Sequence, residues 1–410
     1  MKPFFQVKTP AEVLEILRDF PSVSKEEVGM SSALGRVTAE PITSPENLPP
    51  FHRATVDGYA VLAKDTFGAS DGVPVYLEMI GEIFMGEEAR DPISAGRAIK
   101  IATGGMLPAV ADAVVMEEYT NLPDNRTLEV TRACAPWDGV LRTGEDVRLG
   151  DMILEPGRLI RPQEIGALSA LGIVRLGVYR KPVVSLIATG DELVNPEQVP
   201  APGQIRNLNQ YSIGAMIEEC GGIVDHRGII RDDYETIHGV VTDCLERSDL
   251  VLISGGSSIG RKDFTVEIIE SLGKPGVLVH GISISPGKPT IVARIGDKPV
   301  IGLPGHPVSA MIVFEVFMKP LIRRLAGLPT QSEHGGKKLR ARLSRNVASA
   351  QGREDYIRVA LEKSNGGWAA QPVLGKSSMI STMIRADGYI RIDLNSEGFR
   401  EGQEVEVTLF

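Results

Sequence analysis

Four segments of the chain place glycine and polar side chains directly after apolar runs, and these residues are the best suited to chemistry. In the first segment, Thr189, Gly190, Asp191 and Glu192 follow an apolar run that ends at Ala188. Two carboxylates at the end of a buried strand suit a Mg²⁺ ion that is held partly by protein and partly by a phosphate. A helix or turn cap is the structural alternative for this pair of acids.

The second segment, residues 254–263, reads SGGSSIGRKD and lies between a predicted strand and a predicted helix. Backbone N–H groups in such a loop can converge on an anion at the start of the helix. The glycine spacing is similar to that of a P-loop. Arg261 and Lys262, however, stand where a P-loop has Lys and Ser or Thr, so the P-loop interpretation fails.

The same loop also fits the G-x-S-x-G pattern of a nucleophile elbow at 256–260. Ser258 would be the nucleophile, and Asp297 and His306 follow it in the order that hydrolases use. Against this interpretation, the loop is long and rich in glycine, and the oxyanion-loop pattern of the hydrolases has no counterpart. A serine hydrolase that uses Ser258 stays open as an alternative function.

The third and fourth segments also point to anion binding. The sequence SPGKP at 285–289 places Lys288 on a turn stiffened by Pro and Gly, which makes its ammonium a fixed positive charge. The sequence GLPGHPVS at 302–309 ends a strand and begins a helix with Pro307, so free N–H groups there can face an oxyanion. His306 in this segment has an alternative interpretation as a helix cap.

Two further polar residues beside glycine lie in the N-terminal half. Asp57 lies within TVDGYA and Thr103 within IATGGMLP. Taken alone, both segments are typical of turns. The six His residues show no spacing typical of a zinc site.

The elements around the four segments predict an open α/β sheet, whose ligands bind outside the carboxyl ends of the strands. From Lys181 onward, apolar runs alternate with amphipathic helices. We expect one helix to be capped by Asn209 and the next by a capping box of Asp232 and Glu235. This alternation predicts a mostly parallel, doubly wound sheet. The runs lie at 183–188, 223–230 and 250–253.

The rest of the chain predicts three further units. Thr9, Pro10 and Glu12 mark the start of a first helix. Short apolar runs separated by turns predict a small β domain, and period-two alternation near the C-terminus predicts a β-barrel. We therefore predict a multidomain α/β plus β protein. Its parts are a composite helical and β domain from 1–45 with 139–177, a small β domain at 46–138, an α/β domain at 178–329 and a C-terminal β-barrel at 330–410.

Composition excludes several classes of protein. The chain has 410 residues, with 44 Lys and Arg against 53 Asp and Glu and a formal net charge of −9, which disfavours a nucleic-acid partner. Cys134, Cys220 and Cys244 are too few and too far apart for a disulfide framework or a thiolate zinc site, which favours a reducing compartment. With no signal peptide and no apolar run of membrane-spanning length, we expect a cytoplasmic protein without a membrane partner.

Seven motifs occur together in a fixed order. They are TVDGYA, IATGGMLP, GEDVRLG, ATGDEL, SGGSSIGRKDF, SPGKP and GLPGHPVSA, followed by the strand YIRV. In this combination the chain resembles the molybdopterin molybdenumtransferase family, the molybdenum-insertion enzymes that include bacterial MoeA and the E domain of gephyrin. The resemblance covers nearly the whole chain.

The resemblance implies a transferase that takes adenylylated molybdopterin and molybdate, or tungstate, with Mg²⁺. Such an enzyme cleaves the phosphoanhydride, releases AMP and leaves molybdenum on the dithiolene of the pterin. The implied catalytic residues are Asp57, Thr103, Glu192, Asp232, Asp263 and Lys288, with Glu192 and Asp263 as metal ligands. The implied substrate-binding residues are Thr189, Gly190, Asp191, Ser254, Gly255, Gly256, Ser257, Ser285, Gly287, Pro304, Gly305, Ser309, Arg358 and Ser377.

The resemblance also implies partners. Family members are elongated homodimers in which the α/β domain of one subunit, the molybdopterin-binding domain, shares a site with the β domain of the other. The composite domain would then serve dimerisation, and the molybdopterin adenylyltransferase is an expected partner. A pterin-binding scaffold of the same fold that has lost its chemistry stays open as a second alternative.

Two positions depart from the family pattern. Ser285 stands where the family usually has Lys in a Lys-Pro-Gly-Lys-Pro turn, and His306 stands where the family usually has Asn. Loss of one cation would weaken the attraction for an oxyanion. The choice between molybdate and tungstate therefore stays open.

Overall fold

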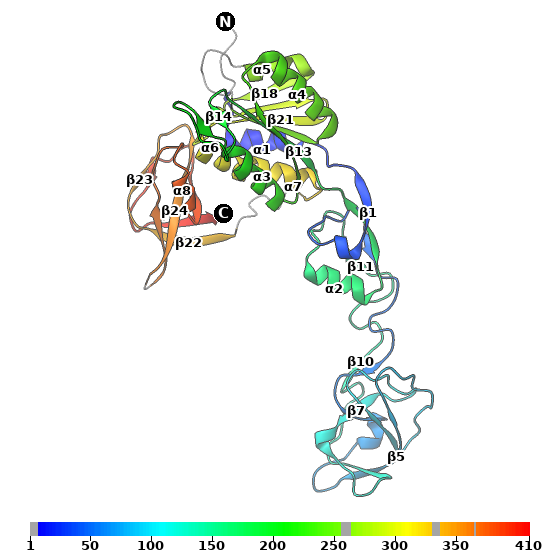
Figure 1. Ribbon diagram of the computed structural model, residues 1–410. Coiled ribbons are helices and arrows are strands. Elements are labelled where there is room, and N and C mark those ends of the chain that lie inside the picture. The colour runs from blue at the N-terminus through cyan, green and yellow to red at the C-terminus, as the bar shows by residue number, and fades with distance from the viewer. Residues whose placement is uncertain (1–6, 256–263, 330–336, 365) are drawn as a thin grey trace.

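The computed structural model describes residues 7–255, 264–329, 337–364 and 366–410. Figure 1 shows an elongated molecule with an α/β unit and a C-terminal barrel at one end. A composite of two chain segments lies in the middle, and a small β unit lies at the other end. This arrangement confirms the multidomain α/β plus β architecture. Among the described helices, none is long and apolar enough to cross a membrane.

The sheet of the α/β unit has six strands, of which the first four in spatial order are parallel. The fifth runs antiparallel to them, and the sixth, antiparallel to the fifth, runs in the same direction as the first four. In spatial order these are β16 (Ile223–Ile230), β13 (Val183–Thr189), β17 (Leu250–Ser254), β21 (Lys298–Leu303), β20 (Ile291–Ile295) and β18 (Pro275–His280). Ser254 at the end of β17 lies opposite Ala188 of β13 and Leu303 of β21. The loops after these three strands therefore begin side by side, at the edge where parallel sheets bind ligands.

Helices cover both faces of this sheet, as in a doubly wound fold. Leu186 of β13 points into one buried cluster and Ile187 into another, as the period of a strand requires. The helices on the first face are α3 (Asn209–Glu219), α6 (Pro307–Val313), the π-helical turn η4 (Phe314–Met318) and α7 (Lys319–Leu325). Those on the second face are α4 (Tyr234–Arg247) and α5 (Phe264–Leu272).

The N-terminal helix α1 (Pro10–Arg18) begins as predicted, because Thr9 and Glu12 exchange the two side-chain to backbone hydrogen bonds of a capping box. Its apolar stripe packs on η4 and α7 of the α/β unit. We expected residues 1–45 to build the composite domain. The helix lies elsewhere because its buried face packs against η4 and α7 of the α/β unit.

Two other helix starts differ from the prediction. The N-cap position of α3 is Leu208, and Asn209 is the first residue of the helix. The cap of α4 is Asp233, whose side chain accepts a hydrogen bond from the N–H of Thr236 at 2.9 Å, rather than Asp232. Adjacent polar residues compete for a cap, and the sequence does not decide between them. The side chains of Asn209 and Asp232 are therefore free of a capping role.

The composite unit combines two segments that are far apart in the sequence. β1 (Lys25–Gly29) pairs with β12 (Arg175–Tyr179), and β2 (Ile42–Thr43) pairs with β11 (Met152–Leu154). The unit also contains the short helix η1 (Met30–Ser32) and the helix α2 (Pro162–Ala170). Its antiparallel pairs form the connection between the α/β unit and the small β unit (Figure 1).

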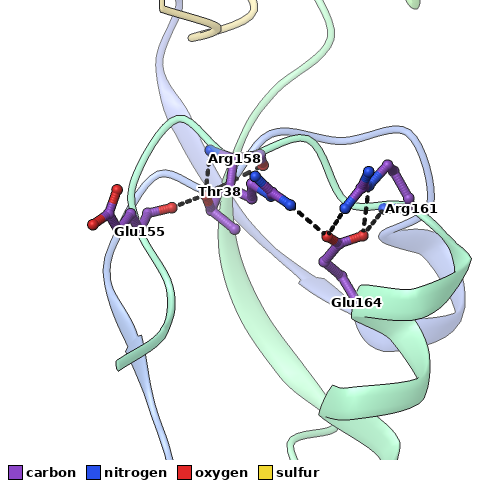
Figure 2. Close-up of polar contacts among 5 residues, drawn as sticks. All are labelled: Thr38, Glu155, Arg158, Arg161 and Glu164. Carbon is purple, nitrogen blue, oxygen red and sulfur yellow. Dashed lines mark hydrogen bonds and ion pairs between the residues drawn. The ribbon is translucent and has the colours of Figure 1, made fainter. Parts of the chain in front are cut away.

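A polar network built on the buried side chains of Glu164 and Thr38 lies at the start of α2 (Figure 2). The carboxylate of Glu164, 6% exposed, pairs with Arg158 at 3.2 Å and with Arg161 at 2.6 Å. The hydroxyl of Thr38 donates to the carbonyl of Glu155 at 2.6 Å and accepts from the N–H of Arg158 at 2.9 Å. These bonds tie the segment before β2 to the segment before α2.

We expect Glu164→Gln to destabilise the protein in a pH-dependent way. Hydrogen bonds from Arg161 lower the pKa of Glu164 from 4.5 to about 2. A carboxyl with a lowered pKa stabilises the fold at neutral pH, and this stability disappears as the pH falls from 4.5 to about 2. Urea unfolding should therefore show a steeper loss of stability on acidification for the wild type than for the variant. Parallel pH profiles would contradict this role.

The small β unit is built on a six-stranded sheet. In spatial order its strands are β7 (Ala113–Met116), β4 (Gly58–Val61), β6 (Arg97–Ile101), β5 (Val75–Ile83), β9 (Thr127–Val130) and β8 (Thr120–Asn121). β3 (Arg53–Ala54) with β10 (Val140–Leu141), and the short helices η2 (Ala63–Thr66) and η3 (Glu117–Tyr119), complete the unit. Gly58 pairs with Ile101, which places Asp57 beside the loop that contains Thr103.

The C-terminal unit is the predicted β-barrel. Its closed circuit is β24 (Glu354–Ser364), β25 (Gly367–Pro372), β22 (Lys338–Leu343), β28 (Glu404–Leu409) and β26 (Gly388–Ile392), which pairs back with β24. β23 (Val347–Ala348) pairs with β27 (Gly398–Phe399), and α8 (Ser381–Ile384) follows β25. β19 (Ile284–Ser285) of the α/β unit pairs in parallel with β24. This pairing joins the barrel to the turn that carries Lys288.

Candidate functional site

A cavity of about 1850 Å³ lies where the loops after β13, β17 and β21 meet the C-terminal barrel. Most of the residues singled out in the sequence line this cavity. From the α/β unit these are Thr189, Gly190, Asp191, Glu192, Asp232, Ser254, Gly255, Ser285, Gly287, Lys288, Pro304, Gly305 and Ser309, and from the C-terminal unit Arg358 and Ser377. The structure therefore brings together segments that span almost 200 positions of sequence.

The remaining predicted residues do not line this cavity in the described structure. Asp57 and Thr103 lie in the small β unit at the other end of the molecule (Figure 1). There the carboxylate of Asp57 accepts a hydrogen bond from the N–H of Thr103 at 2.7 Å, and this bond lowers the pKa of Asp57. Gly256, Ser257 and Asp263 lie outside the described residues.

Three carboxylates contribute to the cavity from the loops after β13 and β16. Glu192 folds back over Gly190, where an added Cβ would meet its Oε2 at 2.7 Å. Oδ1 of Asp191 accepts a hydrogen bond from the backbone N–H of Asp232 at 3.3 Å. Burial and the negative charges of Asp191 and Glu192 raise the pKa of Asp232. The three acids therefore repel one another and favour a nearby cation.

This set of donors fits a hard divalent cation. Mg²⁺ prefers oxygen ligands and is commonly held by one or two carboxylates together with waters and phosphate oxygens. In the described part of the chain, no group of three His, Cys, Asp or Glu residues forms a ready-made metal cage. A cation beside Glu192 would therefore complete its coordination with substrate oxygens. Asp263, the other predicted ligand, is not among the described residues.

The ends of the strands form a buried polar floor in the cavity. At Gly255, with φ +110°, an added Cβ would meet Oγ1 of Thr189 at 2.8 Å, so the close approach of the two strands requires glycine. Nδ2 of Asn209 donates to Oγ of Ser254 and to the carbonyl of Gly305, each at 2.9 Å. Thr189 is 4% exposed and Asn209 is 7% exposed.

Asn209 is the residue of this floor that sequence reasoning missed, because it was assigned to a helix cap. It lies four residues before Ile213 and eight before Ile217, and both side chains are fully buried. Positions spaced by four share one face of a helix. A polar residue on the inward face of an amphipathic helix is the signal that could have placed Asn209 toward the site.

Positive charge reaches the cavity from a turn and from the barrel. At Gly287, with φ +120°, an added Cβ would meet Val313 at 2.5 Å, so the turn that carries Lys288 packs closely on α6. Arg358 is 6% exposed, and burial lowers its pKa. Its Nη2 donates to the carbonyl of Gly375 at 3.1 Å, but its Nε has no partner among the described residues. A buried guanidinium with a spare donor favours an anion.

His306 joins the α/β unit to the C-terminal unit at the rim of the cavity. Its Nδ1 lies 2.9 Å from Oγ of Ser377, and the N–H of Val308 donates to the carbonyl of Ser377 at 3.0 Å. His306 occupies the N-cap position of α6, but its side chain makes no capping bond. The imidazole therefore connects two loops instead of capping the helix.

The geometry does not support the serine hydrolase alternative. Asp297 precedes β21 and His306 follows it, so these two residues lie roughly 20 Å apart along a strand of six residues. Asp297 instead pairs with Arg294 at 2.7 Å. A catalytic histidine needs its acid within hydrogen-bond reach. Ser258 itself lies outside the described residues.

Comparison with known families matches three consecutive parts of the chain. The MoeA N-terminal region (domain I and II) matches residues 8–172. The family described as "Probable molybdopterin binding domain" matches residues 185–324. The MoeA C-terminal region (domain IV) matches residues 340–410. The second match contains the strand ends that form the cavity, and the third contains Arg358 and Ser377.

Individual relatives match along the whole chain. A molybdopterin molybdenumtransferase of Bacillus subtilis is 32% identical over 410 residues, which covers 98% of this chain and 94% of the relative. Two solved structures of molybdopterin biosynthesis MoeA proteins from Pyrococcus horikoshii are 40% and 32% identical, with TM-scores of 0.83 and 0.86. The first match covers 98% of this chain and 99% of the solved chain. The second match covers 99% of this chain and 100% of the solved chain. The chain therefore belongs to the MoeA family of molybdopterin biosynthesis proteins.

Proposed function

We propose that this chain is a molybdopterin molybdenumtransferase that takes adenylylated molybdopterin and molybdate, cleaves the phosphoanhydride with Mg²⁺, releases AMP and leaves molybdenum on the dithiolene of the pterin. The observation that carries this proposal is that one cavity contains both carboxylates, such as Glu192, and the cations Lys288 and Arg358. The carboxylates are required to bind a divalent cation together with phosphates, and the cations are required to bind an oxyanion. The name of the Bacillus subtilis relative, molybdopterin molybdenumtransferase, supports the transfer of molybdenum.

Lys288, Arg358 and Ser309 would bind the oxyanion. The Lys288 turn and the barrel strand that carries Arg358 are held together by the pairing of β19 with β24. Ser309 is buried in the first turn of α6 and lines the same cavity. Two cations and a hydroxyl suit a tetrahedral dianion, and tungstate has the same charge and shape as molybdate. The proposal therefore includes tungstate as a second oxyanion.

Glu192, together with Asp263, would hold Mg²⁺ on the phosphate side of the substrate, and the neighbouring carboxylates of Asp191 and Asp232 would add negative charge that attracts the cation. A bound Mg²⁺ supplies charge neutralisation at the phosphoanhydride. The carboxylates are already gathered by the hydrogen bond from the Asp232 backbone to Asp191. Burial and, to a smaller extent, the repulsion from Asp191 and Glu192 raise the pKa of Asp232, and a bound cation relieves this repulsion.

We propose that the protein acts as a homodimer whose active site is shared. Asp57 and Thr103 lie in the small β unit, far from the cavity of the same chain (Figure 1). A second copy can bring its small β unit to the open cavity, where Asp57 and Thr103 would reach the nucleotide. Large apolar side chains exposed on the composite unit support a contact between copies. They are Leu34, Leu149, Met152, Leu159 and Val174.

The substrate implies a supplier. Adenylylated molybdopterin requires an enzyme that transfers AMP to molybdopterin, so we propose a molybdopterin adenylyltransferase as a partner. Cys134, Cys220 and Cys244 are not paired in disulfides, as expected for the cytoplasmic location that we propose.

The proposed function is tested by reconstitution. Purified protein is incubated with adenylylated molybdopterin, molybdate and Mg²⁺, and the product is transferred to the apo-form of a molybdenum enzyme. We expect the apo-enzyme to gain activity only when this protein and molybdate were both present. Activation that does not depend on this protein would contradict the proposed function.

The turn at Ser285 gives a quantitative prediction. If Lys288 supplies the positive charge of this turn, Ser285→Lys should add a second cation to the turn, beside that of Arg358 from the barrel, and tighten molybdate by about 1–2 kcal/mol through a charge-assisted hydrogen bond. Lys288→Ala should weaken molybdate. Titrating molybdate and tungstate against the wild type and both variants measures these effects. Unchanged affinity in both variants would mean that this turn is not the oxyanion site.

A further inference from the structure

Asn209 connects two walls of the cavity through its side-chain amide. Nδ2 donates to Oγ of Ser254, at the end of β17, and to the carbonyl of Gly305, in the loop after β21, each at 2.9 Å. Ser254 and Leu303 are register partners in these adjacent parallel strands. The amide therefore sets the separation of two loops that leave the sheet side by side.

These two hydrogen bonds determine which way the amide points. A backbone carbonyl only accepts hydrogen bonds, so the atom that faces Gly305 must be the NH₂ group. Both donors of the amide are then used, and Oδ1 is left as an acceptor. Among the residues that the structure describes, none donates to Oδ1 of Asn209 and none bonds to Oγ1 of Thr189. Both atoms are buried in residues that line the cavity.

A buried polar atom without a partner is uncommon, because it has lost its hydrogen bonds to water without replacing them. Oδ1 of Asn209 requires a donor, and the hydroxyl of Thr189 can both donate and accept. Phosphate and molybdate oxygens are acceptors at neutral pH, so they do not satisfy Oδ1. The pterin ring system carries N–H donors and is the part of the proposed substrate that fits.

We propose that Asn209 is a substrate-positioning residue, whose NH₂ group holds Ser254 and Gly305 at a fixed separation and whose Oδ1 accepts a hydrogen bond from an N–H group of the pterin, while the Thr189 hydroxyl gives the same cavity a second polar contact. This inference rests on the proposed function and adds where one part of the substrate lies. Asn209 thus acts on orientation and affinity rather than on the reacting phosphorus or molybdenum.

Binding of molybdopterin, followed by quenching of pterin fluorescence, tests both parts of the inference. Asn209→Ala removes the bridge and the acceptor, and we expect its Kd for molybdopterin to rise at least tenfold. Thr189→Val keeps the shape of the side chain and removes only the hydroxyl, so we expect a smaller rise, about threefold. Ser248→Ala is the matched control, because Ser248 is also buried and bonds to the carbonyl of Cys244 at 2.7 Å, before the start of β17. It should lower the Tm without changing the Kd.

Asn209→Asp provides a readout that a merely structural role would not change. At neutral pH the carboxylate of this variant places an acceptor opposite the carbonyl of Gly305, which is also an acceptor. The hydrogen bond to Gly305 is then lost, so molybdopterin should bind as weakly as it does to Asn209→Ala. A buried carboxyl has a raised pKa, and once protonated it can donate to this carbonyl. We therefore expect the Kd of Asn209→Asp to recover at least threefold between pH 8 and pH 5.5. Other groups that can titrate also line the cavity, namely Asp191, Glu192, Asp232 and His306. Because Asn209→Ala retains all of them, its Kd at each pH serves as the baseline.

The outcomes separate this inference from the proposed function. A wild-type protein that binds neither molybdopterin nor its adenylylated form overturns the proposed function. A wild type that binds and turns over, with Asn209→Ala within twofold of its Kd, overturns the inference about Asn209. So does an Asn209→Asp variant whose Kd follows that of Asn209→Ala across the whole pH range.

Discussion

Glu192→Gln should lower the rate of AMP release about 100-fold or more, since loss of one charged group at a phosphate or metal site has effects of this size. Its carboxylate folds over Gly190 at the cavity, and its charge adds to burial and to Asp191 in raising the pKa of Asp232. Glu192 is exposed, so its replacement should change the free energy of unfolding by no more than about 0.5 kcal/mol. AMP release and Tm are the two measurements.

Glu197→Gln is the matched control for this variant. Glu197 is exposed on the segment between β14 (Leu193–Val194) and β15 (Ile205–Arg206), and it does not line the cavity. It removes the same charge a few residues away, so AMP release should be unchanged. Asp263→Asn should behave like Glu192→Gln if the resemblance assigns Asp263 correctly. Full Mg²⁺-dependent AMP release by Glu192→Gln would show that its proposed role is wrong.

Mixing two inactive variants should restore activity if the site is shared between subunits. Asp57→Ala damages the small β unit and Glu192→Ala damages the cavity, so a mixed dimer contains one intact site and one site damaged twice. Random exchange of equal amounts makes half of the dimers mixed, which gives roughly a quarter of wild-type activity. Complete pairing of unlike subunits would give roughly half.

The controls decide what a negative result means. Each variant alone should stay inactive before and after the exchange procedure, and subunit exchange is verified by mass spectrometry of differently tagged chains. No recovery after verified exchange would show that each site lies within one chain. Asp57 and Thr103 would then have to act at a second position, away from the cavity.

Much of the lining of the cavity could be predicted from the sequence because its residues follow strand ends. Thr189 and Ser254 each end a run of buried apolar residues, and parallel strands bring such ends to one edge of the sheet. Lys288 could be placed because Pro and Gly restrict its turn. Such local patterns are kept in the folded chain. The segments that were singled out in the α/β unit therefore line the cavity.

Other features depend on contacts that a local pattern does not contain. Whether Asp232 or Asp233 caps α4 depends on the residue at which the helix begins, and a shift of one residue changes the answer. The packing of α1 on α7 is decided by which apolar face is available in the folded molecule. The bridge from Asn209 to Gly305 joins residues almost a hundred positions apart. Such long-range contacts are the part of the site that the sequence alone did not predict.

The most direct test of the proposed activity is AMP release from adenylylated molybdopterin by the purified protein, with molybdate and Mg²⁺ added separately and together. We predict that AMP appears only when both are present, and that bound molybdenum appears on the pterin in equal amount. Omission of either should leave the adenylylated substrate intact. Tight binding of the substrate with no AMP release under any of these conditions would contradict the proposed activity and would indicate a pterin-binding scaffold.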